Sequence, residues 1–266
     1  MLQLKIPDDL KQAPQPFLFR EWFLGSPVRR WMEYERRNDH VTRLAGPGPG
    51  RRILDVGCDW GYACMSIARS GAEAWGVDID RDAIAYGLQL AEANGIGIHL
   101  SYAHARRLPF ADRRFDAITA IETIEHIPSA ELHAVFQELS RVLKPGGVVV
   151  LSTPNPVGLT ELAKRALGRS RRLRRRFYGS YHDEGRTRVL PGGDLMVDGL
   201  VSPADLKRAL AGTGLALARA DYIVFVSKFL PAWLLAPAKA AEWVLERTPL
   251  VRRLASTSVY LLDKVC

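Results

Sequence analysis

The chain has 266 residues, of which 47% are apolar, enough for one elaborated domain with a sizeable core. Its three cysteines are too few for a disulfide framework, and its N-terminus has acidic residues and no long apolar run, so we expect a cytoplasmic protein without a signal peptide. The most apolar later stretch, residues 222–236, contains Lys228 and Pro231 and is too short to span a membrane.

The net charge of +8 is unevenly distributed along the chain. Residues 1–156 carry 18 basic and 19 acidic side chains, whereas residues 157–266 carry 19 basic and 10 acidic ones. This asymmetry predicts an anionic partner for the second segment: a phosphorylated substrate, a membrane surface or nucleic acid. A solvated basic surface is the plain alternative.

The first elements are punctuated by glycine and proline. Residues 1–25 are expected to be irregular, and Ser26 followed by proline predicts the start of a helix that runs to about Ala45, where GPGPG ends it. A buried strand over residues 51–56 and a helix that closes at Gly71 follow.

Strands and helices then alternate. Strands are expected over residues 73–79, 98–103, 115–121 and 148–154, and helices over 80–94 and 129–143, the second one capped by Ser129. Such alternation is typical of βαβ units and a parallel sheet. We therefore divide the chain into an N-terminal helical segment (1–49), a core (50–156) and a basic, amphipathic segment (157–266) whose last strands, near 215–225 and 256–265, join the same sheet.

The segment ILDVGCDWGYA places Gly57 and Gly61 at the turn after the first strand, where a ligand can approach the backbone and a helix N-terminus. Asp78 ends the second strand, 21 residues after Gly57, and can accept both hydroxyl groups of a ribose. Nucleotide or dinucleotide binding is the rival interpretation. It is weakened because the chain lacks both the G-x-G-x-x-G pattern and a Walker lysine.

These segments resemble the class I S-adenosylmethionine-dependent methyltransferases. ILDVGCDWG is similar to their motif I and GVDID to their motif II, and LPFADRRFDAIT, IETIEHIP and LSRVLKPGGVVVLSTPN resemble later core segments, in the right order, over residues 50–155. The resemblance implies an α/β, Rossmann-like fold: a seven-stranded, mostly parallel sheet with helices on both faces and a C-terminal helical cap. It also implies S-adenosylmethionine as the cofactor.

The resemblance assigns roles to individual residues. Asp78 would bind the ribose, with Ile79 against the adenine, and Glu122 would close the pocket after the fourth strand. The residues implied to shape the pocket for the methionine moiety are Asp55, Gly57 and Gly61.

Two positions depart from the family pattern. Asp59 stands where a second glycine is usual; it could cap the following helix or meet the cofactor's ammonium group. His104 stands where an acid usually binds the adenine amino group; a ring nitrogen could accept that bond, or the backbone near Ala105 could read the base.

Glu122, Glu125 and His126 form a compact group after the fourth strand, at the edge where open α/β sheets bind ligands. His126 could act as a base toward an acceptor hydroxyl, with Glu125 beside it, or the three could hold a divalent metal; a purely structural histidine is the third possibility. This E-x-x-E-H run is similar to that of the ubiquinone-biosynthesis O-methyltransferases. Together these residues predict methyl transfer to a small-molecule acceptor.

The basic segment 164–176 has an apolar face beside its arginines, and a second apolar, aromatic segment lies near Trp233 and Trp243. They predict a lid over a lipophilic acceptor or a peripheral contact with a membrane; an ordinary helical cap is the alternative. A soluble anionic or sugar-type substrate and a non-catalytic partner protein stay open. A nucleic-acid substrate is disfavoured, since AIETIEH replaces the Asn/Asp-Pro-Pro-aromatic run of amino-group nucleic-acid methyltransferases.

Overall fold

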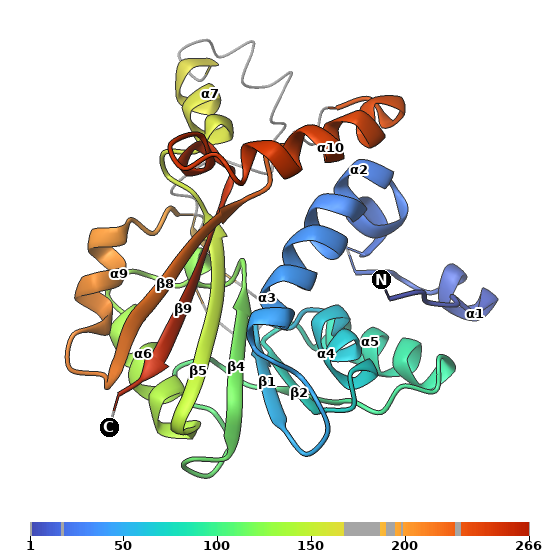
Figure 1. Ribbon diagram of the computed structural model, residues 1–266. Coiled ribbons are helices and arrows are strands. Elements are labelled where there is room, and N and C mark those ends of the chain that lie inside the picture. The colour runs from blue at the N-terminus through green and yellow to red at the C-terminus, as the bar shows by residue number, and fades with distance from the viewer. Residues whose placement is uncertain are drawn as a thin grey trace.

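The computed structural model describes residues 2–16, 19–167, 187–189, 195–197, 199–226 and 230–265. Figure 1 shows one twisted sheet with helices on both sides. The strands of this sheet are β1 (Arg52–Val56), β2 (Glu73–Asp78), β3 (His99–Tyr102), β4 (Phe115–Ile121), β5 (Leu143–Pro154), β8 (Leu215–Ile223) and β9 (Thr257–Lys264).

The sheet has the strand order β3-β2-β1-β4-β5-β9-β8. Neighbouring strands from β3 to β5 run parallel, and β9 lies antiparallel between β5 and β8. The predicted seven-stranded, mostly parallel Rossmann-like sheet is therefore confirmed. The order reverses between β1 and β4, and ligands of open α/β sheets bind at the strand ends beside such a reversal.

Helices cover the two faces with separate apolar clusters. On one face, α6 (Leu132–Val142) and α9 (Pro203–Leu210) pack against β4, β5 and β9. On the other, α3 (Asp39–Leu44) and α4 (Tyr62–Arg69) cover β1 and its neighbours. Beyond α4, α5 (Arg81–Ala93) closes the β2–β3 side, capped by the Asp80 carboxylate, which accepts hydrogen bonds from the next turn.

The N-terminal part is more helical than its sequence predicts. The described residues before Ser26 contain α1 (Asp8–Gln12) and the wide turn η1 (Phe19–Leu24), so an irregular segment was the wrong expectation. The Ser26 cap is confirmed: Ser26 Oγ accepts a hydrogen bond from the Arg29 backbone at 3.3 Å. The helical run after it consists of α2 (Pro27–Arg29), the π-helical η2 (Arg30–Asn38) and α3.

The start of α6 also differs from the prediction. The helix begins at Leu132, and Ser129 does not cap it, because Pro128 and Glu131 first close a tight turn through a 2.8 Å backbone hydrogen bond. The other described elements are α7 (Leu159–Leu167), the small hairpin β6 (Thr187–Val189) and β7 (Leu195–Val197), the one-turn η3 (Ile124–His126), η4 (Ala232–Leu234) and η5 (Val251–Leu254), and α10 (Leu235–Leu245).

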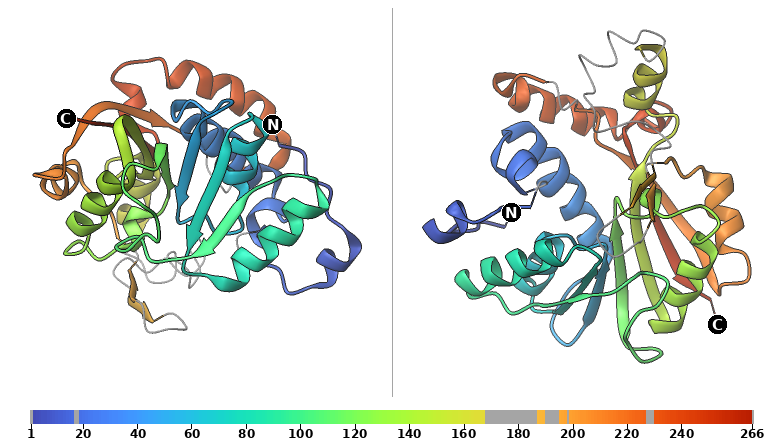
Figure 2. Two further views of the ribbon diagram at one scale, coloured as in Figure 1. Left: turned by 90° about the horizontal axis from the view of Figure 1, so that it is seen from below. Right: turned by 180° about the vertical axis from the view of Figure 1, so that it is seen from behind.

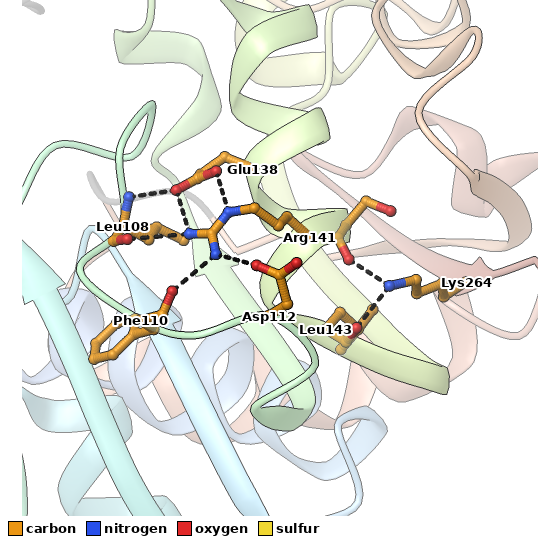
Figure 3. Close-up of polar contacts among 8 residues, drawn as sticks. Leu108, Phe110, Asp112, Glu138, Arg141, Leu143 and Lys264 are labelled. Carbon is orange, nitrogen blue, oxygen red and sulfur yellow. Dashed lines mark hydrogen bonds and ion pairs between the residues drawn. The ribbon is translucent and has the colours of Figure 1, made fainter.

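Arg141 on α6 ties the irregular β3–β4 connection to the core (Figure 3). Its guanidinium group donates to the Glu138 and Asp112 carboxylates at 2.6–2.8 Å and to the carbonyl oxygens of Leu108 and Phe110 at 3.1 and 2.8 Å. One planar fork thereby satisfies five acceptor contacts. This tie fixes the last part of the loop, next to the amino ends of β4 and β5.

The helices α7 and α10 lie beyond the carboxyl ends of the parallel strands, at the end of the molecule opposite the C-terminus (Figures 1 and 2). α10 is held to the N-terminal helices by an ion pair between Glu246 and Arg36, and Lys239 lies 5.1 Å from the centre of the Trp31 ring. No helix within the described residues is long and apolar enough to cross a membrane.

Candidate functional site

The turn between β1 and α4 requires its two glycines. Gly57 has a φ of +75°, and a Cβ atom there would lie 2.4 Å from the Thr123 side chain, so no other residue fits without a rearrangement. Gly61 has a φ of +78° and precedes the first residue of α4 without any side-chain cap. The free N–H groups of α4 therefore face the space above the turn.

Asp78 lies at the carboxyl end of β2, directly beside this turn. Its two carboxylate oxygens accept hydrogen bonds from the backbone N–H groups of Asp59 and Asp80, at 2.7 and 2.9 Å. The backbone thus fixes the direction of the carboxylate and leaves lone pairs for hydroxyl donors. Asp59 itself does not cap α4, because Gly61 is the capping position, so that alternative was wrong.

Three carboxyl groups, those of Asp55, Asp59 and Asp78, gather around the turn. Burial, opposed by the Thr119 hydroxyl bond and aided by Asp78, raises the pKa of Asp55 to about 7. Burial and the Asp78 charge raise the pKa of Asp59 to about 8, and burial also raises the pKa of Asp78. Among the described residues no ion pair joins any of the three to a basic side chain. This cluster suits a cationic ligand and repels a pyrophosphate.

The remaining cofactor-side positions lie at the rim of the turn. Ile79 and Ala105 are half-buried, as is His104. The Nδ1 atom of His104 accepts a hydrogen bond from the Arg106 backbone at 3.2 Å, which leaves Nε2 as the atom that carries the proton in the neutral ring. The predicted bond from the adenine amino group to the ring would need Nε2 as an acceptor, so in this geometry a donor bond from Nε2 is the one available.

Glu122 lies at the end of β4 with a φ of +50°, uncommon for a residue other than glycine. The Ser152 hydroxyl donates to Oε1 at 3.0 Å, and Arg37 from η2 lies 3.1 Å from Oε2. These two contacts fix both carboxylate oxygens and help to hold the Glu122 backbone in its uncommon conformation. Arg37 also pairs with Glu33, one turn earlier on the same helix.

Glu125 and His126 follow on η3 but do not share one environment. Glu125 is 4% exposed, and burial together with the nearby Glu122 charge raises the pKa of its carboxyl well above the usual range. His126 is half-buried, and its backbone N–H donates to the Thr123 carbonyl at 3.0 Å. Within the described residues no group of three or more His, Cys, Asp or Glu side chains is placed to hold a metal, so Glu122, Glu125 and His126 do not form the metal site considered from sequence.

Arg37 and Ser152 are the site residues that the sequence prediction missed. Arg37 is 8% exposed, but it lies in a run of charged residues that is typical of a solvent-exposed helix face. Only its spacing of four residues from Glu33 indicates an ion pair. Ser152 is fully buried within an apolar strand, where a single serine gives no signal. Both reach Glu122 from segments distant in sequence, so no local pattern could have placed them.

The chain is similar to known methyltransferases. It matches the family described as "Methyltransferase domain" over residues 53–147. It is 32% identical over 202 residues to the ubiquinone biosynthesis O-methyltransferase of Chelativorans sp., a match that covers 74% of this chain and 72% of that protein. With the Alkalilimnicola ehrlichii protein of the same name the identity is 38% over 126 residues, and the chain spans about half of that relative's length, 48%.

The fold is also found in solved structures. The chain superposes on a geranyl diphosphate methyltransferase in complex with S-adenosylmethionine with a TM-score of 0.58 and 19% identity, over 98% of this chain and 96% of the other. S-adenosylmethionine carries a sulfonium and an ammonium group, and the acidic turn fits such a cation, with Asp78 placed for its ribose hydroxyls. The length of the Chelativorans match, the fold and the turn agree, and the chain belongs to the class I S-adenosylmethionine-dependent methyltransferases.

Proposed function

We propose that this enzyme methylates a hydroxyl group of a lipophilic or lipid-like small molecule. The observation that carries the proposal is an exposed apolar surface on α7, α10 and the turns beside them, at the end of the sheet where the acceptor would enter. Two relatives point the same way, since their names concern ubiquinone biosynthesis, and a structural neighbour is named for geranyl diphosphate. A soluble anionic or sugar-type acceptor is the alternative.

The cofactor would lie across the turn, with its ribose on Asp78 and its adenine between Ile79 and the His104–Ala105 backbone. Bound there, it supplies an activated methyl group on a positively charged sulfur. The Arg37 guanidinium lies 3.1 Å from the Glu122 carboxylate at this end of β4, and its Nε atom is buried without a hydrogen bond. We propose that Arg37 binds the methionine carboxylate, because a buried N–H without an acceptor costs about 1–3 kcal/mol unless a ligand satisfies it.

His126 is proposed as the group that takes the proton from the acceptor hydroxyl. It lies at the carboxyl end of β4, where the acceptor must approach the methyl group, and a half-buried imidazole can exchange its proton with water. Glu125 differs from His126, because its carboxyl is buried and burial together with the nearby Glu122 charge raises its pKa well above the usual range. We assign to Glu125 the positioning of η3, through its carbonyl oxygen, which accepts a bond from Gly199 at 3.1 Å.

The apolar surface, called here the cap surface, spans α7, η4, α10 and η5. Trp233 is 77% exposed, Trp243 60% and Leu250 80%, and large apolar side chains exposed together mark interaction surfaces. Exposed arginines lie among them, and the Arg247 guanidinium stacks on the Trp243 ring at 4.0 Å. The other members of the cap surface are Val157, Leu159, Leu162, Arg165, Arg252, Arg253 and Leu254.

Aromatic rings interleaved with arginines suit the interface of an anionic membrane, where the rings enter the headgroup layer and the guanidinium groups meet phosphates. The positive charge of residues 157–266 matches such a surface. Figure 1 shows α7 and α10 beyond the carboxyl ends of the parallel strands, which is the end of β4 that η3 follows in the chain, so a lipid-like acceptor would enter the site from that end. Residues 168–176, which hold most of the arginine run noted in the sequence, lie outside the described residues.

Vesicle sedimentation tests the membrane part of the proposal. The protein should pellet with phosphatidylglycerol vesicles at low salt and leave them at high salt, and it should ignore phosphatidylcholine vesicles. The triple variant Trp233→Ser, Trp243→Ser, Leu250→Ser should lower binding at least tenfold. Leu217→Ser, which removes a 51% exposed leucine on β8, is the matched control and should bind as the wild type does. Wild type that stays in the supernatant at low salt contradicts membrane contact.

Methyl transfer to phenols of increasing alkyl chain length tests the acceptor. Turnover should rise with chain length and rise further with anionic vesicles, and His126→Gln should lower kcat with little change in cofactor affinity. Turnover only on sugars or short anions would favour the alternative acceptor class. Tight cofactor binding without turnover on any acceptor would indicate a non-catalytic partner protein.

A further inference from the structure

Asp59 is a carboxylate that the fold keeps in an unfavourable place. Its φ is +47°, a left-handed conformation that glycine adopts freely and that costs an aspartate about 1 kcal/mol. The side chain does not cap α4 and no described basic residue pairs with it, although its carboxylate accepts a hydrogen bond from the Trp60 backbone. A glycine at this position would suit the same backbone conformation, so the turn does not require the carboxylate.

The surroundings of Asp59 add negative charge and no positive charge. Asp78 and Asp80 face it from the end of β2, Asp55 lies beneath the same turn, and the uncharged phenol of Tyr34 approaches from η2. By contrast, the ion pairs described elsewhere around the site neutralise their carboxylates, as Arg37 does for Glu122. The turn therefore lacks a described internal cation, and a ligand cation offsets the charge that these carboxyl groups carry when they are ionised.

We infer that the Asp59 carboxylate binds the α-ammonium group of the cofactor's methionine moiety. Asp59 adjoins the N-terminus of α4 on one side and, through its own N–H, the ribose-side carboxylate of Asp78 at 2.7 Å on the other. With the ribose on Asp78, the methionine moiety would extend across this turn toward the end of β4. An ammonium group on that path meets Asp59, and a charge-assisted bond there would fix the methionine chain.

The inference makes Asp59 a specificity residue for the amino group. A glycine at this position, usual in the resembled family, offers only backbone atoms, so this chain should depend on the ammonium group more strongly than a chain with glycine would. The dependence should disappear with the carboxylate, whatever the acceptor of the enzyme is. The inference therefore stands apart from the proposed acceptor and rests only on cofactor binding at the turn.

Calorimetry with two ligands on three proteins tests it. The ligands are S-adenosylhomocysteine and its analogue with hydrogen in place of the α-amino group. In the wild type the loss of the amino group should weaken binding at least tenfold. In Asp59→Asn and Asp59→Gly that loss should cost less than threefold, since the partner is gone. Asp82→Asn, an exposed acid on α5, should behave as the wild type does.

The outcomes separate cleanly. If both Asp59 variants discriminate between the two ligands as strongly as the wild type does, the inference is overturned. Asp59→Gly also guards against a folding defect, because glycine suits the positive φ, and its thermal unfolding should match or exceed that of the wild type. Wild type that binds neither ligand would contradict the cofactor site itself, a result distinct from failure of the Asp59 inference.

Discussion

The site has two acidic regions, and they differ in whether a basic side chain of the protein neutralises them. Around the β1–α4 turn, Asp55, Asp59 and Asp78 have no basic partner among the described residues, and burial raises the pKa of each. At the end of β4, Glu122 is held by Arg37 from η2. The first group is built from contiguous motifs and left for a ligand to neutralise; the second is neutralised within the chain by a distant helix.

Removal of the internal cation should have the largest effect. Arg37→Met would leave Glu122 and Glu33 without their partner, and we expect a loss of about 2 kcal/mol in the free energy of unfolding, because an unpaired charge of low exposure is costly. Arg43→Met, which breaks an exposed pair with Asp39, is the control and should cost less than about 0.5 kcal/mol. Urea unfolding measures the stability of both variants. Equal losses would contradict the claim that Arg37 neutralises Glu122 and Glu33.

Removal of an acid from the unneutralised group should act on binding. Asp78→Ala is expected to weaken S-adenosylhomocysteine binding at least tenfold, about 1.4 kcal/mol, since the ribose hydroxyls lose their acceptor. Its stability without ligand should change little or rise, because a carboxyl with a raised pKa is lost. Calorimetry and thermal unfolding report the two effects. Unchanged affinity would remove Asp78 from the site.

A buried carboxyl group outside the site should make stability depend on pH. Burial and the neighbouring Glu246 raise the pKa of Glu242 on α10 to about 7, above its ordinary value of 4.5. The folded state therefore binds this proton more tightly, and its contribution to stability is present below pH 4.5 and lost as pH rises toward 7. Glu242→Gln should raise stability at pH 8 by about 1 kcal/mol and flatten the decline. Glu92→Gln, at an exposed site on α5, should leave the pH dependence of stability unchanged. If Glu242→Gln and the wild type lose stability identically as pH rises, the role of Glu242 is contradicted.

Substitution of His104 should have the smallest effect on cofactor affinity. Two variants distinguish a hydrogen bond to the adenine from a role in shaping the loop. Gln can place a donor where Nε2 lies, whereas Asn can place an acceptor where Nδ1 meets the Arg106 backbone. If Nε2 donates to the adenine, His104→Gln should keep S-adenosylhomocysteine affinity within threefold, about 0.6 kcal/mol, and His104→Asn should lose more. The reverse order would mean that His104 only shapes the loop.

The same contrast explains what the sequence could predict. Residues 50–155 follow contiguous motifs in which glycine, aspartate and apolar periodicity have local meanings, so the sheet and the turn were predictable from them. The cap of α6 was not, because the turn from Pro128 to Glu131 competes with Ser129 for the start of the helix. Arg37 and Ser152 were out of reach for a different reason: tertiary packing alone brings them to Glu122.

The measurement that tests the account most directly is the number of protons released when S-adenosylmethionine binds. Calorimetry at pH 7 in two buffers of different ionisation enthalpy gives that number. With pKa values of about 7 and about 8, Asp55 is about half protonated and Asp59 is mostly protonated at pH 7 in the free protein, and a bound cation favours release of these protons. We predict a release approaching about one proton, reduced in Asp59→Asn. Binding without proton release, or with uptake, would contradict the claim that the acidic turn is neutralised by its ligand.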